Sequence, residues 1–273
     1  MFKLIETQHV REYLDSIKEV NTVAVDTETW YNPSRRDAVI RFIKDSRGVL
    51  TPNNEPFIVS MSTDPNSGVV IECNTHTIPL LQEFFSRHRT VIFFNANFDL
   101  HMLHNVGIKP RGYFVDIMVM HQLINEEDTY EGKPLFGLDN IARKYRSDDA
   151  DKYAKEVLNV RKQLATANDC SYHDIDYYQV YKARPDIMIP YAASDTRDTF
   201  YLYEKFLPMI HSENLEKPFD VEMRIIPIVF QIERNGYGVI EENVEAAEKR
   251  LNKELKDTEA QIHMVVGDQI NRN

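Results

Sequence analysis

Two carboxylates, Asp26 and Glu28, lie two residues apart directly after an apolar run at residues 22–25. Side chains of a strand alternate between its two faces, so both acids point to the same side if the run is a strand. Like charges held side by side cost free energy unless a cation lies between them, and carboxylate oxygens are ligands for Mg²⁺ or Mn²⁺. The spacing therefore indicates a candidate metal site, whereas the simpler interpretation is an ordinary strand end with two solvated acids.

A third acid, Asp99, follows a second apolar run at residues 91–94. It falls in the first turn of a helix that is predicted to begin near Asn97. Helix caps and the helix dipole both favour an acid at that position, so helix stability alone would explain it. Asp99 becomes a candidate for chemistry only in combination with the other acids.

The third element is a phenol and a carboxylate, Tyr191 and Asp195, four residues apart. On a helix this spacing places both side chains on one face, where they can reach the same cleft. The small residues between them, Ala192 and Ala193, would let the helix approach a sheet closely. A surface Tyr/Asp pair is common, however, and Asp198 is predicted to be an equally exposed acid one turn further on.

The elements that must position these residues alternate between short β-branched or aromatic runs and helical patterns. This alternation predicts an α/β fold with a central sheet flanked by helices. The predicted strands are residues 22–25, 57–61, 69–71 and 91–94, with a turn at 64–68. From Phe114 onward the pattern is mostly helical. The predicted helices are residues 78–88, 97–106, 117–125, 138–145, 151–164, 189–210, 222–235 and 242–266.

Two parts of the chain stand out from this pattern. Residues 148–184 are polar and tyrosine-rich, and we interpret them as a helical insertion in a domain that spans residues 1–212. Residues 213–273 form a separate helical segment. Within it, Gly236 is predicted to end a helix, because glycine commonly takes a positive φ just past a helix end.

The composition, with 42% hydrophobic and 27% charged residues, is that of a soluble globular protein. Two cysteines are too few for a disulfide framework or a zinc site. No run approaches the roughly 18 apolar residues that a membrane span needs, so we expect a cytoplasmic protein without a membrane partner. The net charge of −11 argues against tight non-specific binding to a nucleic-acid duplex. It leaves open a cleft that binds a few nucleotides of one strand.

Together, the segments around Asp26, Asp99 and Asp195 resemble the three exonuclease motifs of the DEDD nuclease superfamily, in the subclass whose third motif is Tyr-x-x-x-Asp. Residues 114–145 look like the stretch between the second and third motifs of family A DNA polymerases and RNase D-like enzymes. Residues 222–239 are similar to the segment that joins the proofreading and polymerase domains of phage-type family A enzymes. The resemblance covers nearly the whole chain and includes none of the family's polymerising motifs.

This resemblance implies an RNase H-like fold and two-metal-ion hydrolysis. Asp26, Glu28, Asp99 and Asp195 would hold two Mg²⁺ ions, for which Mn²⁺ could substitute, and Tyr191 would orient the attacking water. The implied DNA contacts are Thr29, Asn95 and the aromatic surface of Phe98. The implied reaction removes 5′-mononucleotides from single-stranded or frayed DNA 3′ ends, as proofreading in a bacterial or phage-infected cytoplasm. The alternatives are an RNase D-like RNA-processing nuclease and a non-catalytic scaffold that binds a polymerase or DNA.

Two further segments suggest how the protein meets its partners. The loop after Glu28 carries Arg35, Arg36 and Arg41, and we expect it to guide the single strand toward the metals unless it is simply a solvated loop. Residues 219–273 carry an apolar stripe along a helix. This stripe is predicted to dock a separately encoded polymerase subunit or a second copy of itself, or else to fold back on the domain.

Overall fold

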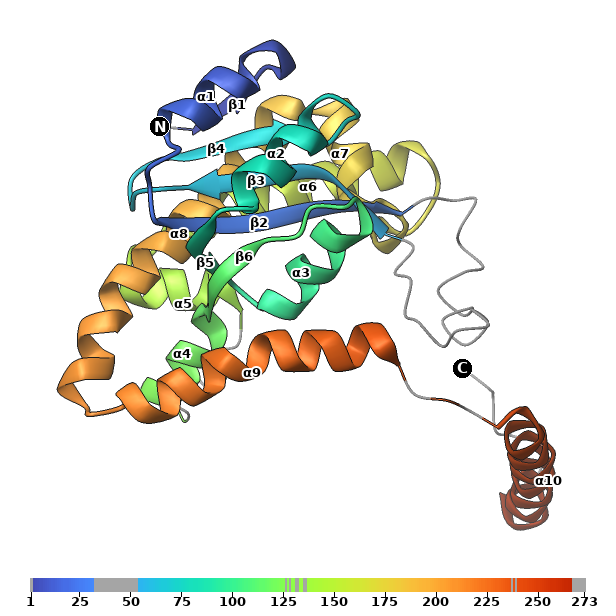
Figure 1. Ribbon diagram of the computed structural model, residues 1–273. Coiled ribbons are helices and arrows are strands. Elements are labelled where there is room, and N and C mark those ends of the chain that lie inside the picture. Colours follow the sequence, from blue (N-terminus) through green and yellow to red (C-terminus); the bar gives the residue numbers. More distant parts are fainter. Residues whose placement is uncertain are drawn as a thin grey trace.

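The computed structural model describes residues 2–31, 54–125, 127, 129–130, 133–134, 137–236, 238 and 240–266. At its centre is a mixed six-stranded sheet in the order β1-β4-β3-β2-β5-β6 (Figure 1). The strands are β1 (Phe2–Ile5), β2 (Thr22–Tyr31), β3 (Asn54–Ser62), β4 (Gly68–Glu72), β5 (His88–Phe93) and β6 (Arg111–Asp116). β3 pairs antiparallel with β2 and β4, whereas the β1–β4, β2–β5 and β5–β6 pairs are parallel. A separate hairpin joins β7 (Thr129–Tyr130) and β8 (Lys133–Pro134).

Helices cover both faces of this sheet. They are α1 (Val10–Ser16), α2 (Thr77–Phe85), α3 (Ala96–Asn105), α4 (Ile117–Ile124), α5 (Leu138–Tyr145), α6 (Lys152–Ala167), α7 (Tyr177–Ala183), α8 (Pro185–Ser212), α9 (Glu216–Asn235) and α10 (Glu241–Val266). The long helix α8 crosses one face, with α6 and α7 beside it, and α2 and α3 lie on the other (Figure 1). Burial on both faces explains why residues 23–25, 57–59 and 91–93 are consecutive apolar residues rather than alternating ones.

The central strand β2 runs past the end of its parallel neighbour. Val23, Ala24 and Val25 are fully buried, and the pairing with β5 reaches only as far as Ala24 opposite Ile92. The strand then continues along β3, with Asp26 opposite Ser60. The acidic motif therefore begins where one edge of β2 loses its ladder partner. Backbone groups on that edge are free to bond with side chains.

The predicted α/β fold with a central mixed sheet and helical C-terminal segment is confirmed. The strand β6 was not predicted, because the sequence pattern was interpreted as mostly helical from Phe114 onward. This strand lies against β5 because Gly112, at φ 136°, leaves room for it; a Cβ there would lie 1.8 Å from the carbonyl oxygen of Arg89. β1 and α1 were not predicted, because β1 becomes a strand only by pairing with β4. Gly236 has the positive φ expected after a helix, 64°.

Candidate active site

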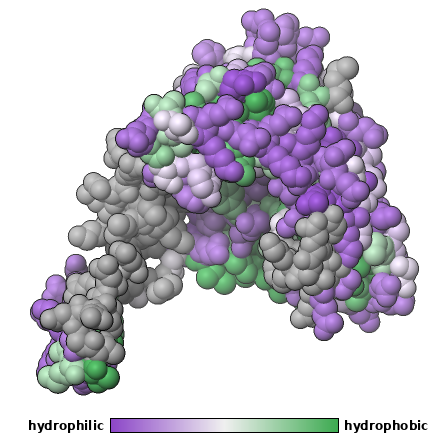
Figure 2. Space-filling view, turned by 180° about the vertical axis from the view of Figure 1, so that it is seen from behind, coloured by the Kyte–Doolittle hydropathy of each residue, from purple (hydrophilic) through white to green (hydrophobic). Residues whose placement is uncertain are grey.

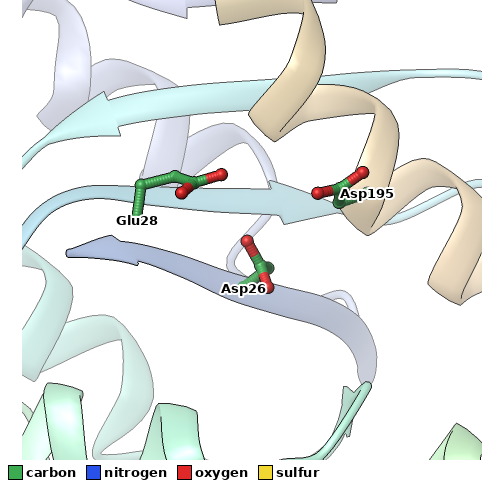
Figure 3. A group of neighbouring side chains, drawn as sticks. All are labelled: Asp26, Glu28 and Asp195. Carbon is green, nitrogen blue, oxygen red and sulfur yellow. The ribbon is translucent and has the colours of Figure 1, made fainter. Parts of the chain in front are cut away.

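Three carboxylates from two elements meet at β2, just beyond its pairing with β5. Asp26 and Glu28 come from the strand and Asp195 from α8, and one oxygen of each lies within 4.8 Å of the others (Figure 3). The strand alternation places the first two on the face that α8 crosses, as the spacing predicted. Glu28 is only 5% exposed. Within the described residues, no lysine or arginine forms an ion pair with any of the three.

Burial and mutual repulsion set the electrostatics of this group. Burial raises the pKa of Asp26 to about 6, against a hydrogen bond from the Thr27 backbone. The pKa values of Glu28 and Asp195 are raised well above their usual range, first by burial and then by the charge of Asp26. Such a set of buried oxygen donors with no basic partner suits a hard divalent cation, whose charge would let all three ionise together.

Asp99 approaches β2 from α3 and is held by Thr27. Its Oδ1 accepts hydrogen bonds from the Thr27 backbone N–H at 2.8 Å and from the Thr27 hydroxyl at 2.6 Å. It is 1% exposed, and burial together with the charge of Asp26 raises its pKa. The structure thus brings three of the four predicted ligands into one group. The fourth lies beside Asp26 but outside that group.

The turn into α3 is fixed by Asp116, a residue that the sequence pattern did not single out. Asn95 takes a left-handed conformation, φ 65° and ψ 62°. Its backbone N–H and that of Ala96 donate to Asp116 at 3.1 and 2.8 Å, and the Met118 N–H donates to the same carboxylate at 2.9 Å. Asp116 therefore caps α4 while it holds the turn before Asp99. Asp116 could have been identified from the sequence as a helix cap, because it is an acid directly before an apolar helix.

Tyr191 lies one turn before Asp195 on α8. Ala192 and Ala193 are fully buried, which confirms that small residues bring this helix close to the sheet. On β4 the contact requires Gly68, since a Cβ there would lie 2.1 Å from the Ala193 carbonyl oxygen. Burial and then the charge of Asp195 raise the pKa of Tyr191 well above its usual value, so its hydroxyl is neutral.

Asp198 is not the exposed acid that the sequence suggested. It is 3% exposed and forms ion pairs at 2.7 Å with Arg146, the residue directly after α5, and with Arg197 of α8. The helical pattern could not reveal this, because Arg146 arrives from a distant part of the chain. Asp198 thus has two basic partners, whereas Asp195 has none among the described residues. The two acids are distinguished by their surroundings.

The predicted DNA-contacting residues lie at different distances from this group. Thr29 follows Glu28 on β2 and is half-buried, at an irregularity in the pairing with β3. Asn95 is exposed, and Phe98 is 42% exposed beside it at the start of α3. Arg35, Arg36 and Arg41 lie outside the described residues.

Comparison with known proteins then decides the family. Residues 5–211 match the model of a family described as 3′–5′ exonuclease. The chain belongs to this exonuclease family. Membership makes it a nuclease, that is, a hydrolase, and agrees with the resemblance drawn from the motifs. No helix in the described part of this exonuclease is long and apolar enough to cross a membrane.

Curated relatives of this exonuclease are phage DNA polymerases. The DNA polymerase of Escherichia phage T5 is 28% identical over 221 residues, which are 75% of this chain and 24% of the relative. DNA polymerase DpoZ of Salmonella phage PMBT28 is 23% identical over 265 residues, 94% of this chain and 37% of the relative. The chain thus spans only about a quarter to a third of the length of these relatives.

Solved structures share the fold at low sequence identity. The POL domain of Pol1 from M. smegmatis, in complex with DNA primer-template and dNTP, has a TM-score of 0.58 and 14% identity, covering 98% of this chain and 38% of that one. Escherichia coli RNase D, an exoribonuclease, has a TM-score of 0.51 and 12% identity, covering 88% and 52%. At this level of identity, these likenesses show that the fold is shared.

Proposed function

We propose that this exonuclease removes 5′-mononucleotides from single-stranded or frayed DNA 3′ ends, as the proofreading activity of a phage-type family A DNA polymerase. The observation that carries the proposal is the group formed by half-buried Asp26 and Asp195 and buried Glu28, with Asp99 and Tyr191 next to it. The phage DNA polymerases among the relatives support DNA as the substrate. The likeness to RNase D concerns the fold, and RNA is kept as an outcome of the test below.

The four carboxylates would hold two Mg²⁺ ions, for which Mn²⁺ could substitute. The residues fit this role because they offer hard oxygen donors and because their charges repel one another without a cation. When bound, the ions supply positive charge to the phosphodiester and activate the attacking water. Thr27 orients Asp99 through two hydrogen bonds, and Asp195 is set at the group by the close approach of α8 to Gly68.

Tyr191 orients the attacking water through its hydroxyl. Burial and the charge of Asp195 raise its pKa, which makes the phenolate inaccessible at neutral pH. The neutral hydroxyl can still donate and accept hydrogen bonds. Tyr191 is thus a positioning group for the water rather than a general base.

The terminal nucleotide would meet Thr29, Asn95 and Phe98. Phe98 is exposed next to Asp99 and offers a ring on which a base can stack. Stacking is tolerant of base identity, which suits an enzyme that removes whichever nucleotide is unpaired. Arg35, Arg36 and Arg41 remain predicted guides of the single strand, because they lie outside the described residues.

The substrate is tested with 5′-labelled DNA and RNA strands of the same sequence, offered with Mg²⁺ and with EDTA. We expect the DNA to shorten one nucleotide at a time from its 3′ end, and faster when that end is mismatched in a duplex than when it is paired. Asp26→Asn is the matched inactive control. Faster loss of RNA would favour the RNase D-like alternative. Binding of DNA without any cleavage would favour the scaffold.

We also propose that the C-terminal helices pack against a DNA polymerase module. One face of α9 is buried in the domain by Phe219, Met223, Ile226 and Phe230. Its opposite face exposes large apolar side chains at a spacing of three or four residues, namely Val221, Ile225, Ile228 and Ile232. Most of the visible surface is hydrophilic, and hydrophobic side chains gather along the lower edge, where α9 runs, and on α10 (Figure 2).

The exposed stripe of α10 does not support the alternative that this helix folds back on the domain. On α10, Val244, Leu251, Leu255 and Ile262 are all exposed. An apolar surface of this kind usually marks an interaction site. A polymerase module is the favoured occupant because the aligned part makes up only 24% and 37% of the two matched phage DNA polymerases. The module could be a separately encoded subunit or could follow in one chain.

The docking proposal is tested by sedimentation with the polymerase module of the same genome. Ile228→Asp combined with Ile232→Asp should weaken binding at least about tenfold, since buried apolar anchors dominate interfaces. Leu158→Asp, at an exposed apolar residue of α6, is the control and should bind like the wild type. Unchanged binding by the double variant would contradict the proposal. So would a self-associated wild type that the variant converts to a monomer.

A further inference from the structure

The tyrosine-rich segment, interpreted from sequence as an insertion, places helix α7 against the active site. α7 packs on both β2 and α8, the elements that carry the acids. Its start is fixed by a capping box: the Asp176 carboxylate accepts from the Gln179 N–H at 2.8 Å, and the Gln179 side chain accepts from the Asp176 N–H at 2.8 Å. The first residue of this well-defined helix is Tyr177.

Tyr177 lies flat against Tyr191. The two rings are nearly parallel, at 15°, with centroids 5.7 Å apart. Burial and then the charge of Glu28 raise the pKa of Tyr177, whereas a hydrogen bond with the Tyr191 side chain lowers it. The ring of Tyr177 is therefore next to both the acids and the tyrosine that faces them.

Arg161 of α6 fixes Tyr177 in turn. Its guanidinium carbon lies 5.4 Å from the centre of the Tyr177 ring. Its Nε donates to the Ile175 carbonyl at 2.8 Å and its Nη2 to the Tyr172 carbonyl at 3.1 Å. These bonds hold the loop that leads into α7. Tyr177 is thus a fixed ring against which the Tyr191 side chain packs.

We propose that Tyr177 is a positioning residue of the exonuclease reaction, which holds the Tyr191 side chain beside Glu28 and Asp195 by ring stacking and a hydroxyl contact. The inference rests on the proposed function, in which Tyr191 orients the attacking water. Geometry of this kind matters because a displacement of about 1 Å in a positioned group can cost about 100-fold in rate. Tyr177 itself acts through Tyr191 and not on the substrate.

The test measures kcat and KM for single-stranded DNA with Mg²⁺ in the full chain. Tyr177→Leu removes the ring and should lower kcat about 10- to 100-fold with KM changed by less than about twofold. Tyr177→Phe keeps the stack, removes only the hydroxyl and should lose about three- to tenfold in kcat. Tyr153→Leu, which alters a tyrosine of α6 whose ring packs on Phe2 of β1, should leave kcat unchanged. Thermal unfolding verifies that each variant is folded.

A double-mutant cycle separates positioning from a structural role. In a Tyr191→Phe background, Tyr177→Phe should cause no further loss, because the hydroxyl that it positions is already gone. Equal losses in both backgrounds, or wild-type kcat for Tyr177→Leu, would overturn the inference while leaving the proposed function intact. Two results would overturn the proposed function of Tyr191 and this inference with it. The first is a wild-type enzyme that does not degrade DNA, and the second is a Tyr191→Phe variant with the kcat of the wild type.

Discussion

Thr27 donates two hydrogen bonds to one oxygen of Asp99, from its backbone at 2.8 Å and from its hydroxyl at 2.6 Å. The backbone donor is available because the pairing of β2 with β5 reaches only to Ala24. The side chain points away from Asp26 and Glu28, since neighbours in a strand face opposite sides. One residue between two acids thus ties a third acid, from another element, to the same strand end.

Replacing that hydroxyl tests the tie. Thr27→Val keeps the shape of the side chain and the backbone bond but removes the 2.6 Å contact. We expect a loss of about 1–2 kcal/mol in the free energy of unfolding and a several-fold loss in kcat. Thr27→Ser, which keeps a hydroxyl, should recover most of the rate. Urea unfolding and single-turnover cleavage measure the two effects, and a fully active Thr27→Val would show that Asp99 needs no such support.

The distance between α8 and the sheet is set at Gly68. A Cβ on Gly68 would lie 2.1 Å from the Ala193 carbonyl oxygen, which belongs to the backbone of α8 and cannot rotate away, so Gly68→Ala must push the helix outward. We expect a loss of about 1–3 kcal/mol in stability and a larger loss in kcat, because Asp195 moves with the helix. Gly137→Ala is the control, since a Cβ there would meet only the Asn140 side chain, at 3.9 Å. Comparable kcat values for the two variants would contradict this account.

Burial of the metal-free Asp26 carboxyl should appear in the pH dependence of stability. Burial raises the pKa of Asp26 to about 6, above the value of about 3.9 in an unfolded chain. Folding therefore favours the protonated acid, and the charged form destabilises the protein above about pH 6. In EDTA, Asp26→Asn should be more stable than the wild type at pH 7.

That difference should shrink as the pH falls through about 6, because the wild-type carboxyl then takes up its proton in the folded state. The difference in stability between the two proteins is free of the contributions that they share. One such contribution is that of His104, because burial lowers its pKa to about 4. At pH 7, Mg²⁺ should stabilise the wild type far more than it stabilises the Asp26→Asn variant. A pH-independent difference between the two proteins would mean that Asp26 carries no such strain.

Asp195 and Asp198 should respond oppositely to the same substitution. Asp195→Asn should abolish most exonuclease activity while it leaves the stability of the metal-free protein unchanged or higher, because it removes a repelling charge. Asp198→Asn leaves Arg146 and Arg197 without their buried partner and should cost about 3–5 kcal/mol in stability. Its rate per folded molecule should change little. Thermal unfolding and kcat are measured on both variants. An inactive Asp198→Asn variant beside an active Asp195→Asn variant would show that the two acids are assigned the wrong way round.

The sequence predicted the local part of this site and not its long-range supports. Alternation along β2 was enough to place Asp26 and Glu28 on one face, and helical spacing paired Tyr191 with Asp195. Gly68 and Asp116 were missed, because each acts on a residue that only the fold brings near. The prediction that Asp198 is exposed was wrong for the same reason, since its partner Arg146 comes from a distant part of the chain. β1 was missed because its pairing with β4 joins segments far apart in the chain.

The most direct test of the account is the cleavage of a 5′-labelled single-stranded DNA as Mg²⁺ is titrated into metal-free wild type, with Asp195→Asn as the comparison. We expect the label to shorten stepwise from the 3′ end only when Mg²⁺ is present, and the variant to be slower by about a thousandfold or more. Stepwise degradation in EDTA, internal cuts, or equal rates for the wild type and Asp195→Asn would contradict it.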